Sequence, residues 1–143
     1  MPITEEVEYW HSANNFCNQF NNGEGRLVAL HSEDELVQLL NIFKAKGNGN
    51  SAVEYWIGIS ESSSSAQWAW ADETLQDFSN WGKHEPNNDY GLKQCGKIIT
   101  NTGMWFATEC TWKLPFACQY TPGKPAGPTP PPARVYNASL DEN

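Results

Sequence analysis

Apolar positions at helical spacing predict two amphipathic helices in the first third of the chain. In the first helix every third or fourth position is apolar, and these positions are Trp10, Ala13, Cys17 and Phe20. Ser32 and Glu35 form a capping box at the start of the second helix, because the side chain of each can accept a hydrogen bond from the backbone N–H of the other. Its core-facing positions are Leu36, Leu39, Leu40 and Phe43. The Asn- and Gly-rich segments 21–25 and 46–50 are expected to end the helices.

Short apolar runs predict strands between and after these helices. Residues 55–59 are apolar without polar alternation, which is typical of a strand buried on both faces. Shorter runs predict further strands at 27–30, 67–71, 96–99, 104–106 and 116–120.

The segment 60–95 is rich in Ser, Asn and Asp and, apart from the strand predicted at 67–71, has little periodicity. A loop this long inside a compact domain is usually either functional or disordered. Large aromatic residues favour order, and this segment holds Trp68, Trp70, Phe78 and Trp81. We therefore expect an ordered loop that carries function.

The composition changes after Tyr120. Residues 1–120 read as one compact domain, whereas residues 121–143 contain six of the nine prolines and no helical or strand pattern. The second segment is predicted to be an extended, disordered tail or linker. It contains Asn137-Ala138-Ser139, a sequence that would be N-glycosylated on a secretory route.

Charge and motifs exclude several classes of function. The net charge of −8, without any Lys/Arg cluster, argues against nucleic acid as a partner. No apolar run approaches the roughly 20 residues of a membrane span, so membrane insertion is not expected in this segment. The chain also lacks a G-x-S-x-G elbow, an H-E-x-x-H motif and a Gly-rich phosphate loop, and we predict that it is not an enzyme.

Four cysteines stand far apart in the sequence: Cys17, Cys95, Cys110 and Cys118. Without a C-x-x-C pair, a zinc knuckle or a thioredoxin-type site is disfavoured. Disulfides are the remaining use, which indicates a secreted protein or an extracellular domain. No signal peptide precedes Ile3, so export would depend on a segment outside this sequence. Four cysteines allow three connectivities, and spacing does not choose among them.

The run Glu85-Pro86-Asn87 carries the most specific candidate chemistry. A carboxylate and an amide oxygen are hard ligands that suit a calcium ion and sugar hydroxyls. The proline between them can fix their orientation, especially if the Glu85–Pro86 bond is cis.

Together these features resemble the C-type lectin-like domain. The matching residues are Trp10, Ala13, Cys17, Leu27-Val28, Trp56-Ile57-Gly58, Asn80-Trp81, Glu85-Pro86-Asn87, Cys95, Cys110 and Leu114-Pro115-Phe116-x-Cys118. The resemblance implies an α+β fold with two helices, two small antiparallel sheets and a long loop that carries the binding surface. It also implies two nested disulfides, Cys17–Cys118 around Cys95–Cys110, and a first strand that is short for the family.

In sugar-binding members of that family, Glu-Pro-Asn supplies two of five ligands for a calcium ion that coordinates mannose-type hydroxyls. The third ligand is a Glu, which corresponds to Lys93 here. The last two are Asn and Asp after a Trp, and they correspond to Phe106 and Ala107, after Trp105. An auxiliary calcium site, where acids are expected, maps to Glu61, Ser65, Asn88, Lys93 and Gln94.

These departures predict that calcium does not bind. An ammonium at 4 Å from a divalent ion is repelled by about 8 kcal/mol at an effective dielectric constant of 20, and too few oxygens remain for the usual six to eight ligands. We expect Lys93 to pair with Glu85 and the side chains of Phe106 and Ala107 to fill the space. No metal or cofactor is predicted, although residual calcium binding stays open. The candidate ligand-binding residues are Glu85, Asn87, Asn88, Asp89 and Lys93.

The sequence therefore favours a non-catalytic extracellular recognition module that binds a protein or a glycan through the long-loop face. The acidic charge weakly favours a basic patch on a partner. The alternative is a calcium-dependent, mannose-type lectin that uses Glu85 and Asn87 with substitute ligands such as Asp89. Ice binding is a related possibility, because some fish antifreeze proteins resemble this fold.

Overall fold

The computed structural model describes residues 3–19, 25–47, 52–62, 67–87, 91–120 and 134–135. It contains both predicted helices, α1 (Trp10–Cys17) and α2 (Glu33–Ala45). α1 buries Trp10, Ala13 and Cys17, as its spacing predicts, and ends earlier than expected, with Asn18 as its C-cap. Phe20 lies outside the described residues.

The capping box at the start of α2 is confirmed, with one bond displaced by a residue. The Glu35 N–H donates to Ser32 Oγ at 3.2 Å, and the Glu35 carboxylate accepts from the N–H of His31, at 2.6 Å, rather than from that of Ser32. The first turn also contains Glu33 and Asp34, whose negative charges suit the positive end of the helix dipole. The start of α2 is thus fixed by local chemistry, and His31 is held directly before it.

Among the described residues, eight strands form the sheet, which confirms the α+β class. They are β1 (Ile3–Glu8), β2 (Arg26–Leu27), β3 (Glu54–Glu61), β4 (Trp68–Trp70), β5 (Cys95–Ile99), β6 (Trp105–Thr108), β7 (Leu114–Tyr120) and β8 (Arg134–Val135). The main order is β1-β7-β3-β5-β6, with β4 beside β3 and with β2 and β8 beside β7. The described pairs are antiparallel except β3 with β7, which is parallel at Trp56 and Phe116. This parallel contact joins what the resemblance implied would be two antiparallel sheets.

The strand predicted at 27–30 is wrong in its extent, since only Arg26–Leu27 forms a ladder, with β7. The next residue changes partner: the Val28 N–H donates to the Ala117 carbonyl at 3.0 Å, and the Val28 carbonyl accepts from Gly58 N–H at 2.8 Å. The segment therefore crosses from β7 to β3. A Cβ at Gly58 would lie 2.7 Å from the Leu27 carbonyl oxygen, so this crossing requires glycine.

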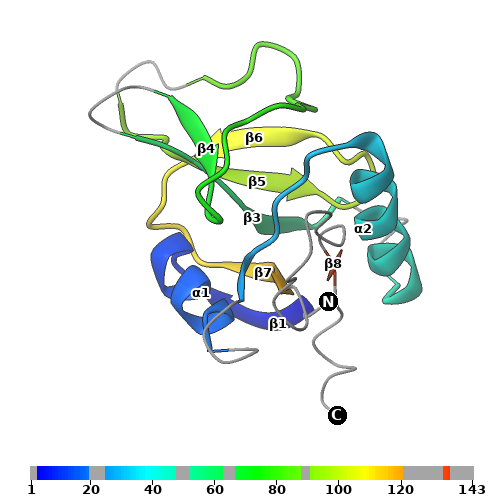
Figure 1. The fold of residues 1–143 in the computed structure, drawn as a ribbon. Coiled ribbons are helices and arrows are strands. Elements are labelled where there is room, and N and C mark those ends of the chain that lie inside the picture. The colour runs from blue at the N-terminus through cyan, green and yellow to red at the C-terminus, as the bar shows by residue number, and fades with distance from the viewer. Residues whose placement is uncertain are drawn as a thin grey trace, which may run out of the picture.

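Different elements occupy the two ends of the molecule (Figure 1). β1, β7 and α1 lie at one end, while β4, β5, β6 and the long loop lie at the other. Despite its expected shortness, β1 pairs with β7 at Ile3, Thr4 and Glu8, with a shift of register between Thr4 and Glu8.

The nested disulfides are confirmed. Cys17–Cys118 joins α1 to β7 across 101 residues, and Cys95–Cys110 joins β5 to the loop after β6 across 15 residues. In the chain-entropy model, closing loops of these lengths with a disulfide stabilises the fold by about 4.7 kcal/mol for the longer loop and about 3 kcal/mol for the shorter one.

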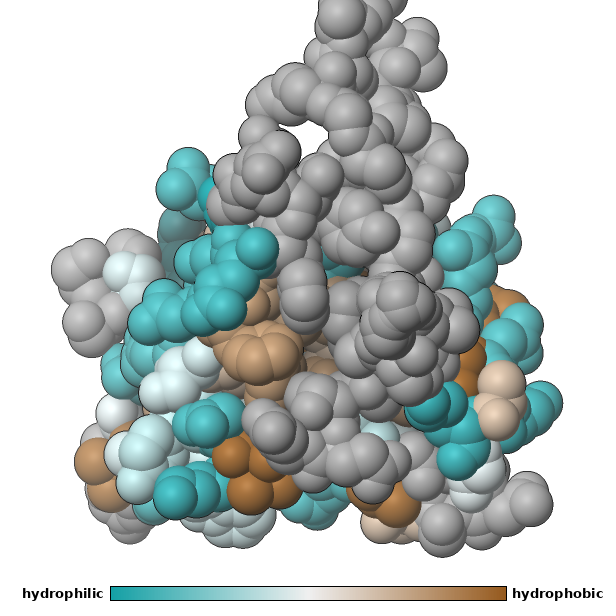
Figure 2. Space-filling view, turned by 90° about the horizontal axis from the view of Figure 1, so that it is seen from below, coloured by the Kyte–Doolittle hydropathy of each residue, from teal (hydrophilic) through white to brown (hydrophobic). Residues whose placement is uncertain are grey.

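The surface at the β1 end is mixed in polarity. Figure 2 shows this end from below, and the described residues visible there are largely hydrophilic, with small hydrophobic areas between them. Within the described part of the chain, neither helix has the length and apolar character needed to cross a membrane.

Of the predicted tail 121–143, only Arg134–Val135 is described. These two residues form β8 and pair with Gln119 and Tyr120 of β7. The sequon Asn137-Ala138-Ser139 lies outside the described residues. The domain boundary at residue 120 stays a prediction.

Candidate functional site

The long loop between β4 and β5 is attached to the sheet along the edge of β6. The Trp105 N–H donates to the Asn80 carbonyl at 3.0 Å, and the Gly82 N–H donates to the Trp105 carbonyl at 2.9 Å. The Asn80 amide adds a bond of 2.6 Å to the Gly103 carbonyl. This part of the loop therefore runs beside β6 like a further short strand.

A layer of aromatic rings supports the loop from beneath. Trp105 is fully buried, and its ring meets those of Trp70, Phe78 and Trp81 edge-on, with centroids 5.3, 6.0 and 5.6 Å away. Such edge-to-face pairs add to the stabilisation by burial. Trp70 belongs to the buried core, and Trp68 and Trp81 pack against it.

Glu85 links the loop to β6 through backbone groups. The Glu85–Pro86 bond is cis. The carboxylate oxygen Oε1 accepts from the N–H of Asn87 at 3.0 Å and from the N–H of Ala107 at 2.9 Å. One side chain thus fixes both its own turn and the neighbouring strand.

Phe106 and Ala107 also contact the loop. A Cβ built on Gly82 would lie 2.8 Å from Cζ of the Phe106 ring, so the ring covers this glycine. Ala107 is buried and offers only its backbone N–H to Glu85. Hydrophobic packing and a backbone hydrogen bond hold the two chain segments together here.

A cavity of about 300 Å³ opens beside Glu85, on the face of β5 and β6 that carries Phe106. Its walls are formed by Glu54, Glu85, Lys93, Lys97, Ile99, Phe106, Ala107, Thr108, Glu109 and Trp112. Of the predicted ligand-binding residues, Glu85 and Lys93 line this cavity, and Lys93 is exposed. Asn87 adjoins Glu85 through its backbone, whereas Asn88 and Asp89 lie outside the described residues.

Three cavity residues form a charged and aromatic cluster that the sequence analysis missed. Lys97 Nζ lies 3.2 Å from Glu54 Oε1 and 4.7 Å from the centre of the Trp112 ring. The Lys97 side chain is only 11% exposed, whereas Trp112 is 47% exposed. Strand register makes the cluster, because Trp56 pairs with Lys97 and Glu54 pairs with Ile99 on β5. In the sequence, the cluster was indicated locally only by Trp112, which follows Cys110 by two residues.

A second cluster surrounds His31, before α2, and it was also missed. The ring atom Nδ1 lies 2.7 Å from Asp77 Oδ1, and because a carboxylate only accepts, Nδ1 carries a proton. On the other side, Nε2 lies 2.8 Å from the hydroxyl of Thr74, which donates to Asp72. The ring also packs edge-on against Trp70. His31 therefore holds the first part of the long loop against α2.

This contact has an electrostatic consequence for Asp77. The hydrogen bond from His31 lowers the pKa of the Asp77 carboxyl below its ordinary value, and the charge attraction of His31 acts in the same direction. Desolvation opposes the effect only in part, since Asp77 is well exposed.

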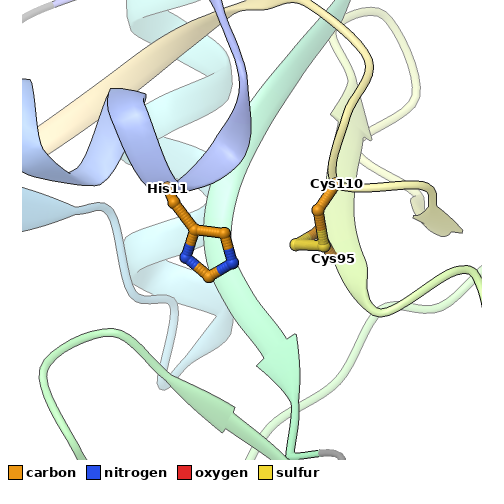
Figure 3. Close-up of side chains that lie close together, drawn as sticks. All are labelled: His11, Cys95 and Cys110. Carbon is orange, nitrogen blue, oxygen red and sulfur yellow. A yellow bond between two sulfur atoms is a disulfide. The ribbon is translucent and has the colours of Figure 1, made fainter.

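One cluster has the spacing of metal ligands without their chemistry. Figure 3 shows the ring of His11, on α1, pointing toward the Cys95–Cys110 disulfide. The ligand atoms of the three residues lie within 4.8 Å of one another. Metal ligation by cysteine requires a thiolate, and both sulfurs are bonded to each other, so the cluster is not a metal centre.

Comparison with known proteins gives consistent results. The family model for the Lectin C-type domain matches residues 6–120. C-type lectin lectoxin-Lio3 of Erythrolamprus poecilogyrus is 32% identical over 116 residues, which cover 80% of this chain and 70% of that protein. C-type lectin BJcuL of Bothrops jararacussu is 28% identical over 119 residues, which cover 82% of this chain and 73% of that protein.

Solved structures agree with this fold. Human lithostathine superposes with a TM-score of 0.71 at 24% identity, covering 81% of this chain and 86% of that one. The carbohydrate-recognition domain of cow CD23, solved in the presence of a GlcNAc2Man3 oligosaccharide, has a TM-score of 0.65 at 27% identity. That match covers 81% of each chain.

Proposed function

Because the chain belongs to the C-type lectin domain family, we propose that it is a non-catalytic extracellular recognition module in which calcium ligation is largely lost. Its ligand is a protein or a glycan, bound at the long-loop face around Glu85. The observation that carries this proposal is the engagement of Glu85 Oε1 by two backbone N–H groups. The two disulfides support an oxidising, extracellular compartment.

The residues around Glu85 do not fit a calcium ion. Calcium takes six to eight oxygen ligands, and the family's set is here reduced to Glu85 and Asn87. One oxygen of Glu85 is engaged by backbone donors. Phe106 presents a ring packed on Gly82, and Lys93 brings a positive charge to the same cavity. Hydrogen bonds and packing hold the loop where an ion would hold it in a sugar-binding relative.

A calcium titration followed by melting temperature tests the loss of the ion. The protein should melt at the same temperature with excess calcium and with EDTA. The matched variant Lys93→Glu/Phe106→Asn/Ala107→Asp restores the family's ligand set, and it should gain a saturable, calcium-dependent rise. A saturable rise in the unmodified protein below about 1 mM calcium, a concentration typical of weak extracellular sites, would overturn the proposal.

A glycan array, run with and without EDTA, separates this proposal from calcium-dependent, mannose-type binding. Glycan binding that survives EDTA supports the present proposal. Binding that EDTA abolishes supports the alternative, in which Glu85 and Asn87 act with substitute ligands. If no glycan binds, a protein ligand remains, and capture of one extracellular protein that Glu85→Ala abolishes would identify it. Absence of both kinds of binding would contradict the proposal.

A further inference from the structure

We propose that His11, Cys95 and Cys110 form a zinc site when the inner disulfide is reduced, so that the disulfide and the metal ion are alternative cross-links at one place in the fold. In the oxidised chain the two sulfurs are bonded to each other and cannot bind a metal. Reduction supplies two thiolates beside an imidazole, and this donor set suits Zn²⁺. The inference goes beyond the proposed recognition function and does not depend on it.

The spacing of the three side chains suits a tetrahedral ion. Their ligand atoms lie within 4.8 Å of one another, and the ring of His11 points toward the two sulfurs (Figure 3). Neighbouring ligand atoms of tetrahedral zinc are about 3.6–3.8 Å apart, since Zn–S is about 2.3 Å and Zn–N is about 2.0 Å. The Cα atoms of Cys95 and Cys110 are 5.2 Å apart. Rotation about the side-chain bonds can therefore separate the sulfurs by the required distance without moving the backbone.

Backbone contacts hold the three residues in place independently of the bond between the sulfurs. Cys95 belongs to β5, which pairs with β3 on one side and with β6 on the other. The Cys110 carbonyl accepts from the Trp10 N–H at 3.1 Å, and this bond ties the loop after β6 to the start of α1, where His11 lies. The arrangement should therefore persist when the disulfide opens.

The neighbouring residue Trp10 positions the ring of His11. Trp10 is 5% exposed, and its indole N–H donates to the Ile57 carbonyl at 2.8 Å. The rings of Trp10 and His11 meet edge-on, with centroids 5.0 Å apart. The imidazole is thus supported by a buried ring, while its own exposure leaves a path for an ion from solvent. With three protein ligands, the fourth position is left for water, as in other open zinc sites.

The inner disulfide is the more accessible of the two. Cys110 is half-buried, whereas Cys17 and Cys118 are fully buried in the core. Thiol–disulfide exchange requires that a thiolate reach one of the bonded sulfurs. A low-molecular-weight thiol should therefore reduce the inner disulfide before the outer one.

The reduction proceeds in two exchanges. A thiolate of the reductant attacks Cys110 Sγ, and the bond to Cys95 breaks with its electron pair going to the Cys95 sulfur. A second reductant thiolate attacks the reductant sulfur of the mixed disulfide and releases the Cys110 thiolate. The protein gains two electrons, and two reductant molecules leave as their own disulfide. Zinc then takes the place of the two protons that the thiolates would otherwise bind.

The two forms belong to different conditions. In an oxidising compartment the disulfide form is expected. Where a thiol reductant and zinc are both present, the ion would keep β5 joined to the loop after β6. Calcium is no substitute in this site, because it takes oxygen ligands.

The test is a cobalt titration of the full chain after selective reduction. The chain is treated with a limited amount of a small thiol, freed of the thiol without oxygen, and titrated with Co²⁺. One equivalent should give a thiolate-to-cobalt charge-transfer band and the d–d bands of a tetrahedral ion, and Zn²⁺ should abolish both. The oxidised chain should give neither band. Alkylation with peptide mapping shows which cysteines have been reduced.

Variants assign the ligands. His11→Asn should weaken cobalt binding by about tenfold or more, since even changes outside the ligand shell cause losses of that size. Cys95→Ser/Cys110→Ser should lose the charge-transfer band after the same treatment. His84→Asn is the matched control, because His84 is also exposed and lies outside this cluster. It should bind cobalt as the native chain does.

Several outcomes would overturn the inference. An unchanged affinity in His11→Asn would mean that thiolates alone hold the ion, and a charge-transfer band that survives in Cys95→Ser/Cys110→Ser would place the ion at the outer pair. Absence of both bands when the inner pair is open, or reduction of the outer pair first, would contradict it as well. If opening the inner disulfide unfolds the chain, zinc should restore the melting transition, because metal binding is coupled to folding. Failure to recover would then overturn the inference.

The proposed recognition function is tested separately. Excess calcium should leave the cobalt spectrum unchanged, and displacement of cobalt by calcium would contradict the thiolate donor set. Failure of the zinc site would leave the calcium titration and the glycan array, both of which use the oxidised chain, unaffected.

Discussion

The two halves of the long loop are attached to the domain by different chemistry. The first half, around Asp72 and Asp77, is held by the side chain of His31, and the contacts are exposed and ionisable. The second half, around Glu85, is held by backbone N–H groups, by the edge of β6 and by the ring of Phe106. The attachment at His31 therefore depends on side chains that carry charge. The attachment at Glu85 depends mainly on packing and on hydrogen bonds to the backbone.

This difference indicates how a loop can stay ordered without an ion. Backbone N–H donors do not titrate. The packing of Phe106 is insensitive to pH and salt. We therefore expect the second half to tolerate changes of solution conditions, and the first half to respond to them.

The largest effect is expected from Trp105→Ala, which removes the ring beneath both halves. Trp105 is fully buried and meets three aromatic rings. Loss of a buried Trp side chain lowers the free energy of unfolding by about 3–5 kcal/mol. Denaturant unfolding measures this change. A loss below about 1 kcal/mol, the scale of a single hydrogen bond, would contradict the role given to the aromatic layer.

Gly82→Ala is expected to disturb only the second half of the long loop, where Gly82 packs against Phe106. The new Cβ would lie 2.8 and 2.9 Å from two atoms of the Phe106 ring, which must move. Overpacking of this kind costs about 1–3 kcal/mol. The same change in a Phe106→Ala background should be nearly neutral, because the clash is gone. Equal losses in both backgrounds, in a double-mutant cycle, would show that the ring does not make the contact.

Removal of Glu85 is expected to have a smaller effect. Glu85→Ala leaves the N–H groups of Asn87 and Ala107 without their partner, and should lower the free energy of unfolding by about 1–2 kcal/mol. Glu85→Gln keeps an acceptor oxygen and should lose less. Calcium should change neither value, since the bonds run to backbone groups. Equal loss in both variants would indicate that charge, and not hydrogen-bond acceptance, is what matters.

The smallest effect, and the one most dependent on pH, is expected from Asp77→Asn. His31 lowers the pKa of Asp77 in the folded state. The stabilisation is therefore complete above the ordinary aspartate pKa of about 3.9, and it is lost as pH falls through the lower folded-state pKa. The difference in melting temperature between the native chain and the variant should shrink in acid, as pH falls through the folded-state pKa of Asp77.

Glu73→Gln is the matched control for Asp77→Asn, because Glu73 is an exposed acid in the same half of the long loop. The difference in melting temperature between Glu73→Gln and the native chain should not shrink in acid in the same way. A profile shared by both variants would mean that general charge, and not the contact with His31, is responsible.

Local sequence patterns predicted the parts of the fold that local chemistry decides. The capping box at Ser32 was found because its partners lie three residues apart. The family resemblance supplied the disulfide pairing, and the structure confirms it. The run at 27–30 was overestimated as a strand, because apolar character does not reveal that Val28 changes its hydrogen-bond partner from β7 to β3.

The clusters that the sequence did not reveal are assembled by tertiary structure. His31 and Asp77 are 46 residues apart, and Lys97 meets Glu54 only because β3 and β5 pair in one register. No spacing rule covers such distances. The Glu85 motif was visible as a sequence, but its backbone partner on β6 depends on how the loop returns to the sheet.

The nested cross-links have a consequence for the response of the chain to proteases. A single peptide-bond cut anywhere between Cys17 and Cys95 would leave two fragments that remain covalently tied through Cys17–Cys118. Such a nicked chain would migrate as one species on a gel until a reductant is added. A clipped domain can thus keep its parts together.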